Sequence, residues 1–205
     1  MRVNRALMTF AILAAMSGCA SPPTRFYALE SDIGTPQTAA LLVNVPPTHR
    51  PGCRGILGPV TLPSLIDRPQ LVVRRGLIRV DILEHERWAE PLRDAIPRIV
   101  LDSLRQAAPD IPVGVVAPTD PAGRTITTTL DVGKFDFQTD GVVIEVRGVI
   151  GSKPMGASRE WSTEVREAAS SPNNDYGAQV LAASRGLEQI GRQLAELFKG
   201  ECRVP

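Results

Sequence analysis

The stretch that decides the fold is Arg124–Phe137, which reads Arg-Thr-Ile-Thr-Thr-Thr-Leu-Asp-Val-Gly-Lys-Phe-Asp-Phe. Its apolar residues alternate with polar ones up to Gly133 and then change phase, which predicts a long strand with a β-bulge at that glycine. The pair Asp140-Gly141 is a hairpin signal, and residues 142–150 form a second, strongly apolar strand. With a third strand over residues 159–166, we expect an antiparallel meander.

Two amphipathic helices are expected around this meander. Apolar residues recur at spacings of three and four over residues 88–107 and again over residues 174–199. Asn173 or Asn174 can cap the second helix, and Gly200 can end it. Strands grouped together, with helices to cover one face, predict an α+β fold. We expect a two-layer sandwich, with a mostly antiparallel sheet and two main helices packed on one face.

Shorter strands are expected in the first half of the chain, because brief apolar or alternating runs are bounded there by turn residues. In one run, Ile78, Val80 and Ile82 share a face that we expect to be half-buried. In another, Gly58-Pro59 marks an irregularity. The expected strands are 24–29, which can be an edge, 56–62, 71–74, 77–83 and 113–116.

The N-terminus has the pattern of a lipoprotein signal peptide. Two arginines precede eleven mostly apolar residues, which are too few to span a bilayer, and Met16-Ser17-Gly18-Cys19 follows as a lipobox. The alternative is an ordinary signal peptide with a chance cysteine. With cleavage before Cys19, residues 1–18 are removed and 187 of the 205 residues remain. Ala20, where inner-membrane lipoproteins of enterobacteria usually carry aspartate, favours the periplasmic face of the outer membrane.

The exported chain then divides into three parts. Residues 19–50 are rich in proline and form a lipidated tether, residues 51–200 form the folded domain, and residues 201–205 form a tail. Cys53 and Cys202 remain as an even pair in an oxidising compartment, where a disulfide is the favoured interpretation. Two separate thiols are the alternative.

Composition excludes several classes of function. The net charge is +1 and aromatic residues make up only 4%, so a nucleic-acid partner is not expected. Esterase, nucleotide-binding and zinc motifs are lacking from the sequence, so we expect no enzyme, no cofactor and no metal site. His85, between two glutamates, is a solvated histidine on this view.

Two segments, 58–74 and 86–92, are unusual for plain connections because they combine prolines, charged pairs and apolar residues. One hypothesis is that the two segments form a partner-binding surface. The alternative is a purely structural role, in which Leu65 and Ile66 fill the core, Asp67 caps a turn and Trp88 is a core residue at a helix start. We favour the structural interpretation for the two segments as a whole. The candidate partner-binding residues are Leu62, Pro63, Asp67, Arg68, Pro69, Gln70, Arg87 and Trp88.

The same segments carry a resemblance. The lipobox followed by Thr-Arg-Phe-Tyr-Ala-Leu (24–29), the Gly-Pro-Val-Thr-Leu-Pro stretch at 58–74, and Arg-Trp-Ala-Glu-Pro-Leu at 87–92 resemble, in their order and spacing, the PqiC/YmbA-type auxiliary lipoproteins of ABC transporters. The resemblance runs from Cys19 to about Gly200.

This resemblance implies a non-catalytic envelope component. Its expected partner is a periplasmic MCE-domain protein, which with an inner-membrane permease and an ATPase moves lipids. The protein is expected to attach to the membrane through its N-terminal lipid. Assembly into a homo-oligomer is an open alternative. Two other hypotheses remain: a structural lipoprotein that binds peptidoglycan or a Tol-like partner, and a periplasmic hydrolase.

Overall fold

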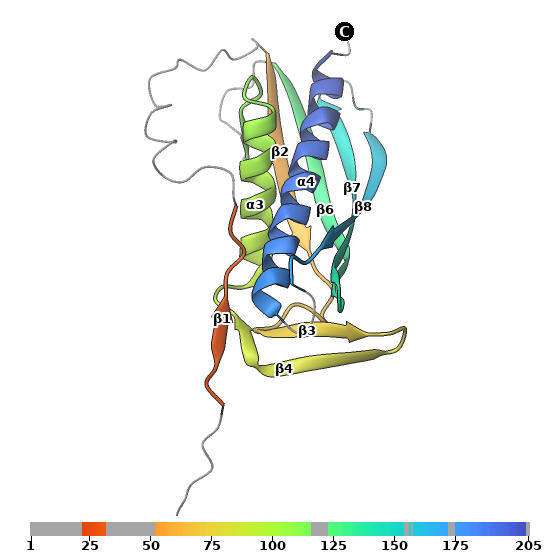
Figure 1. The fold of residues 1–205 in the computed structure, drawn as a ribbon. Helices are drawn as coiled ribbons and strands as arrows, with labels where there is room; N and C mark the ends of the chain where they lie inside the picture. Colours follow the sequence, from red (N-terminus) through yellow and green to blue (C-terminus); the bar gives the residue numbers. More distant parts are fainter. Residues whose placement is uncertain are drawn as a thin grey trace, which may run out of the picture.

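The computed structural model describes residues 22–31, 52–115, 123–153, 156, 158–171 and 175–203, which form two layers. Helices α3 (Leu92–Ala107) and α4 (Tyr176–Arg203) lie side by side and cover one face of a twisted sheet (Figure 1). No helix in the described part of the chain is long and apolar enough to cross a membrane. The expected two-helix layer over one sheet face is therefore present.

The second layer is an eight-stranded sheet. Its path runs β1-β4-β3-β6-β2-β5, and β7 and β8 extend from the other edge of β6. The hairpin of β3 and β4 turns away from the helices and closes one end of the molecule (Figure 1). The strands are β1 (Arg25–Tyr27), β2 (Cys53–Thr61), β3 (Gln70–Arg75), β4 (Arg79–Trp88), β5 (Val113–Gly114), β6 (Arg124–Phe137), β7 (Gly141–Lys153) and β8 (Ser158–Ala168).

The sheet is mixed, and the expectation of a mostly antiparallel sheet is not confirmed. β6–β7, β7–β8 and β3–β4 are antiparallel, whereas β1–β4, β2–β5, β2–β6 and β3–β6 are parallel. Parallel neighbours need a crossover connection, and α3 supplies one between β2 and β6. Turn signals reveal hairpins between consecutive strands, but they carry no information on such distant pairing.

The meander itself matches the sequence-based expectation. β6 has the predicted bounds, and its register with β7 shifts between Val132 and Lys134, where Gly133 predicted a bulge. A second irregularity, between Leu57 and Val60 of β2, falls at the Gly58-Pro59 pair. Period-two patterning and a glycine at the phase change were sufficient for these predictions.

The C-terminal end of α4 differs from the prediction. The Ala178 N–H donates to the Asp175 carboxylate at 3.2 Å, so Asp175 satisfies a free N–H of the first turn, and the predicted caps Asn173 and Asn174 lie outside the described residues. The helix also continues through Gly200 to Arg203, so the predicted end is wrong. Contacts from the sheet hold this last turn in place: the Arg124 guanidinium donates to the Glu201 carbonyl at 2.7 Å.

A disulfide joins the same turn to the first core strand. Cys53 and Cys202 are bonded in the structure, with their Cα atoms 6.0 Å apart and a sequence separation of 149 residues. The link ties the C-terminal end of α4 to the start of β2. The segment interpreted from sequence as a tail thus includes helical residues held against the sheet.

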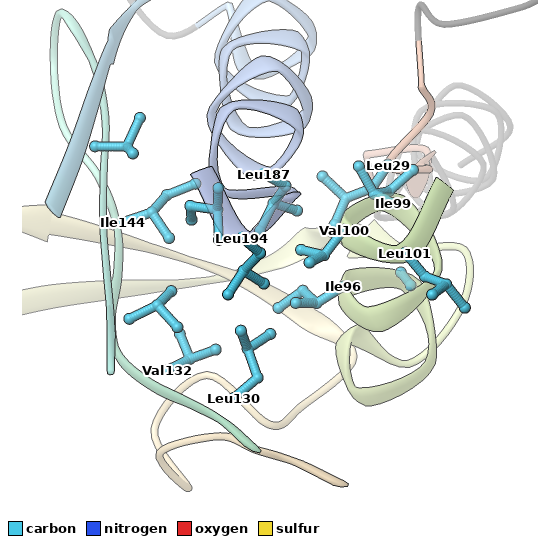
Figure 2. Close-up of a cluster of buried hydrophobic side chains, with 14 of the residues drawn as sticks. Leu29, Ile96, Ile99, Val100, Leu101, Leu130, Val132, Ile144, Leu187 and Leu194 are labelled. Atoms are coloured by element: carbon cyan, nitrogen blue, oxygen red, sulfur yellow. The ribbon is translucent and has the colours of Figure 1, made fainter. Parts of the chain in front are cut away.

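The core lies between the helices and the sheet. Leu130 and Val132 of β6 and Ile144 of β7 face Leu187 and Leu194 of α4 across it, and α3 contributes Ile96 and Ile99 (Figure 2). Leu29, just after β1, is fully buried beside Ile99 (Figure 2). Part of the proline-rich segment before residue 50 is therefore folded into the domain.

The tip of the β3–β4 hairpin contradicts one prediction. Ile78 was expected on a half-buried face, but its side chain is 98% exposed and that of Leu77 is 96% exposed. Gly76, at φ 82°, starts the turn, and β4 begins only at Arg79, so both apolar residues stand beyond the paired strands. Alternation along a chain cannot distinguish a strand from the turn that precedes it.

Candidate functional site

The three segments that carry the family resemblance meet at one corner of the fold. β1 pairs in parallel with the end of β4, with Tyr27 opposite Trp88. The Ala89 N–H donates to the Tyr27 carbonyl at 2.8 Å, and the Trp88 N–H donates to the Pro69 carbonyl at 2.7 Å. Segments that lie well apart in the sequence are thus joined by backbone bonds. We call the surface formed by residues 67–69 and 88–93 the Trp88 corner.

Trp88 supports this corner from the inside. Its side chain is 6% exposed, and its ring lies 6.2 Å from that of Phe135 and 5.8 Å from that of Phe137. Such tilted aromatic packing is typical of a core. Trp88 is therefore a core residue packed against β6, and only a small part of its side chain is exposed, at the corner.

The turn before β3 is held by internal contacts. The Ile66 and Asp67 N–H groups both donate to the Pro63 carbonyl, and the buried Ile66 side chain fills the core. Asp67 pairs with Arg93 of α3 rather than with its neighbour Arg68. Within the described part of the chain, the buried Arg68 Nε has no hydrogen-bond partner. The structural interpretation holds for Ile66, whereas Arg68 keeps a donor unused.

The N-terminal segment is fastened to the corner by Glu86. Its carboxylate accepts a hydrogen bond from the Tyr27 hydroxyl at 2.7 Å and another from the Arg25 guanidinium at 3.2 Å. Burial, together with the bond to the Glu86 carboxylate, raises the pKa of Tyr27 to about 12. Beyond β1, the Arg98 guanidinium donates to the Leu29 carbonyl at 3.0 Å.

A cleft of about 490 Å³ opens at this corner. Its floor is Trp88 and Leu92, both buried, and its rim is Pro69, Ala89, Pro91 and Arg93, all exposed. Arg68 and the Glu90–Arg98 ion pair add charge around the apolar floor. An apolar floor with a charged rim is the general anatomy of a protein-binding surface.

The remaining predicted contacts lie beside the corner rather than in it. Gln70 donates to the Glu84 carboxylate at 3.4 Å, and Arg87 donates to the Glu84 carbonyl at 3.1 Å. Leu62 and Pro63 are half-buried, with Leu62 packed against the core. Cys19 lies outside the described residues. The candidate contacts did not include Ala89, Glu90 or Arg93, although Ala89 and Glu90 lie within the segment 86–92 that the sequence analysis singled out.

A second concave surface lies on the sheet, over β6, β7 and β8. It encloses about 750 Å³ and is lined by strand residues including Asp131, Arg147 and Trp161. Thr61 and Arg147 donate hydrogen bonds to the Asp131 carboxylate at 2.6 and 2.7 Å and lower its pKa. This surface is polar and rich in charged side chains, which makes it the weaker candidate for an apolar partner. In the described ranges, no three His, Cys, Asp or Glu side chains are grouped to hold a metal ion.

Comparison with known proteins establishes the family. The model of the ABC-type transport auxiliary lipoprotein component matches residues 39–195, so the chain belongs to that family. This agrees with the resemblance drawn from the three segments. A comparison with curated proteins gives no significant match.

Two solved structures share the fold. A crystal structure of an uncharacterized protein has a TM-score of 0.62 and 16% identity, over 86% of this chain and 99% of that chain. A Xanthomonas campestris protein assigned to the DUF330 family has a TM-score of 0.60 and 17% identity, over 83% of this chain and 92% of that chain. At such identities the likeness concerns the fold alone.

Proposed function

We propose that this lipoprotein is a non-catalytic docking subunit of an ABC lipid-transport system at the periplasmic face of the outer membrane. Cys19 carries the lipid after removal of residues 1–18, residues 19–50 lead to the domain, and the Trp88 corner binds the periplasmic MCE-domain component. The inner-membrane permease and ATPase complete the system. Membership of a transport auxiliary family supports this role.

The observation that carries the proposal is the meeting of the three family segments at the Trp88 corner, where residues of two of them, 58–74 and 86–92, line the cleft. Buried Trp88 and Leu92 give the cleft an apolar floor, and Arg68 lines it with a guanidinium whose buried Nε has no hydrogen-bond partner among the described residues. Arg68 is only half-buried as a whole, so its guanidinium would pair with a carboxylate of a partner through a charge-assisted hydrogen bond.

The test is to fill the cleft without disturbing the fold. Ala89 is exposed, and its hydrogen bond to the Tyr27 carbonyl is made by the backbone, so Ala89→Arg adds a long cation to the rim without removing that bond. Ala168 is an exposed alanine at the end of β8, and Ala168→Arg is the matched control. Lipidated protein is purified from membranes after mild cross-linking, and the co-eluting proteins are quantified by mass spectrometry.

We expect an MCE-domain protein to co-elute with wild type and with Ala168→Arg, and to be depleted roughly tenfold or more with Ala89→Arg. Equal recovery from the two variants would move the docking surface elsewhere, with the concave surface over β6–β8 as the next candidate. Recovery of peptidoglycan fragments or a Tol-like protein in place of an MCE-domain protein would favour the structural hypothesis.

A further inference from the structure

Exposed apolar side chains gather at the end of the molecule that receives the N-terminal segment. Among the described residues, seven large hydrophobic side chains are exposed, and four of them lie on β1 and the β3–β4 hairpin. These are Phe26 at 66%, Leu77 at 96%, Ile78 at 98% and Ile82 at 40% exposure. Single exposed apolar residues are ordinary, but several at one end of a molecule indicate a site that contacts a protein or a membrane.

The hairpin tip is an unusual place for such residues. Tight turns favour Gly, Asn and Asp, whereas this tip carries Leu77 and Ile78 after Gly76. The buried core includes neither of them, so the fold gains nothing from their size. Of the three arginines in residues 74–81, Arg74 pairs with Asp136 at 2.6 Å, and Arg75 and Arg79 share the Asp81 carboxylate at 3.0 and 3.1 Å, which leaves an excess of one positive charge. The tip is therefore apolar at its point and basic at its base.

The length of the N-terminal segment places this end near the lipid anchor. Arg25 lies six positions after Cys19, and a fully extended chain spans about 3.5 Å per residue, so β1 starts within roughly 20 Å of the lipidated cysteine. Arg25 pairs with Glu86 of β4. The tip lies about seven strand residues further along the hairpin, or roughly 24 Å away. Figure 1 shows β1 and the hairpin at the same end of the molecule, opposite the C-terminus.

We propose that Leu77 and Ile78 insert into the surface of the membrane that holds the lipid anchor. The anchor and the tip then form two points of attachment, which orient the domain on the bilayer. The excess positive charge at the base of the tip complements the phosphates of anionic phospholipids, and the two side chains reach the boundary between headgroups and acyl chains. This inference rests on the proposed lipidation of Cys19 and is independent of which protein occupies the Trp88 corner.

The test is fluorescence quenching by lipids with brominated acyl chains. Lipidated protein is reconstituted into vesicles of phosphatidylcholine and phosphatidylglycerol, and Leu77→Trp carries the probe. Val115→Trp is the matched control, because Val115 is also exposed but follows β5 at the other end of the sheet. Wild type supplies the background from Trp88 and Trp161, and co-flotation with the vesicles reports anchoring separately.

We expect Leu77→Trp to be quenched roughly two- to threefold more than Val115→Trp, since its side chain is at acyl-chain depth. In Leu77→Trp with Ile78→Asp, the carboxylate should return quenching to the control level, which excludes insertion driven by tryptophan alone. Equal quenching of the two single variants on anchored protein would overturn the proposal. So would a blue shift that depends on protein concentration without lipid, because it would assign the tip to a second copy of the chain.

Discussion

The substitution Gly191→Ala should separate the two helices, although alanine is the better helix former. A Cβ atom at position 191 of α4 would lie 2.6 Å from the Val100 carbonyl oxygen and 2.6 Å from the Ser103 Cβ of α3. Ordinary contact distances are near ~3.5 Å, so the helices would have to move apart by about 1 Å. The movement would also strain the buried hydrogen bond from Ser103 Oγ to the Glu188 carbonyl, now 2.7 Å long.

The magnitude follows from two opposing effects. Overpacking of a tight contact costs about 1–3 kcal/mol, and loss of the Ser103 bond adds about 1 kcal/mol. Replacing glycine by alanine inside a helix stabilises the folded state by about 1 kcal/mol through helix propensity. We expect the free energy of unfolding to fall by about 1–3 kcal/mol, which lowers Tm by roughly 3–10 °C for a chain of this length.

Gly200 provides the control on the same helix. An added Cβ there meets nothing within 4 Å, so Gly200→Ala should gain up to about 1 kcal/mol from helix propensity alone. Urea unfolding of both variants, followed by circular dichroism, measures the difference. The close approach of α3 and α4 would be refuted if Gly191→Ala stabilised the protein as much as Gly200→Ala does.

Three further predictions concern the ends of the chain. Cys202→Ser should lower the free energy of unfolding by about 2–4 kcal/mol, because the bond to Cys53 joins residues separated by 149 positions; urea titration measures this, and two free thiols in exported protein would contradict it. The raised pKa of Tyr27 means that its phenol ionises first in the unfolded chain, so stability is full below pH 10 and falls as the pH rises toward about 12. Denaturation measured across this pH range should show a smaller loss of unfolding free energy for Tyr27→Phe than for wild type, and an equal loss would reject the assignment. Cys19→Ala should leave the protein unanchored; firm membrane association of this variant in fractionation would disprove the lipobox.

Local elements could be predicted closely where one residue period runs without interruption. Arg124–Phe137 was predicted with the bounds that β6 has, because alternation, a glycine at the phase change and an Asp-Gly turn are all local signals. The two helices were found for the same reason, through apolar spacings of three and four. Their ends were harder: α4 passes Gly200 because Arg124 and the disulfide to Cys53 hold its last turn, and both lie far away in sequence.

The candidate site was predicted only as a set of segments. Asp67 and Arg68 were named as candidates, yet the partner of Asp67 is Arg93, which no spacing rule connects to it. Trp88 was named for its residue type, whereas its burial against Phe135 and Phe137 depends on how β4 meets β6. Ala89 has no chemical signal at all, and its importance is purely its position on the rim of the cleft.

The sequence alone predicted the main helices and the β6–β8 meander and located the family segments, since each of these is encoded in the spacing of nearby residues. Tertiary structure decided which strands are parallel, which segments share the Trp88 corner, and that Leu77 and Ile78 stand free at a hairpin tip. The physical reason is that side-chain periods act over a few residues. Pairing between distant strands and the burial of a particular ring depend instead on loop closure and on packing summed over the whole core.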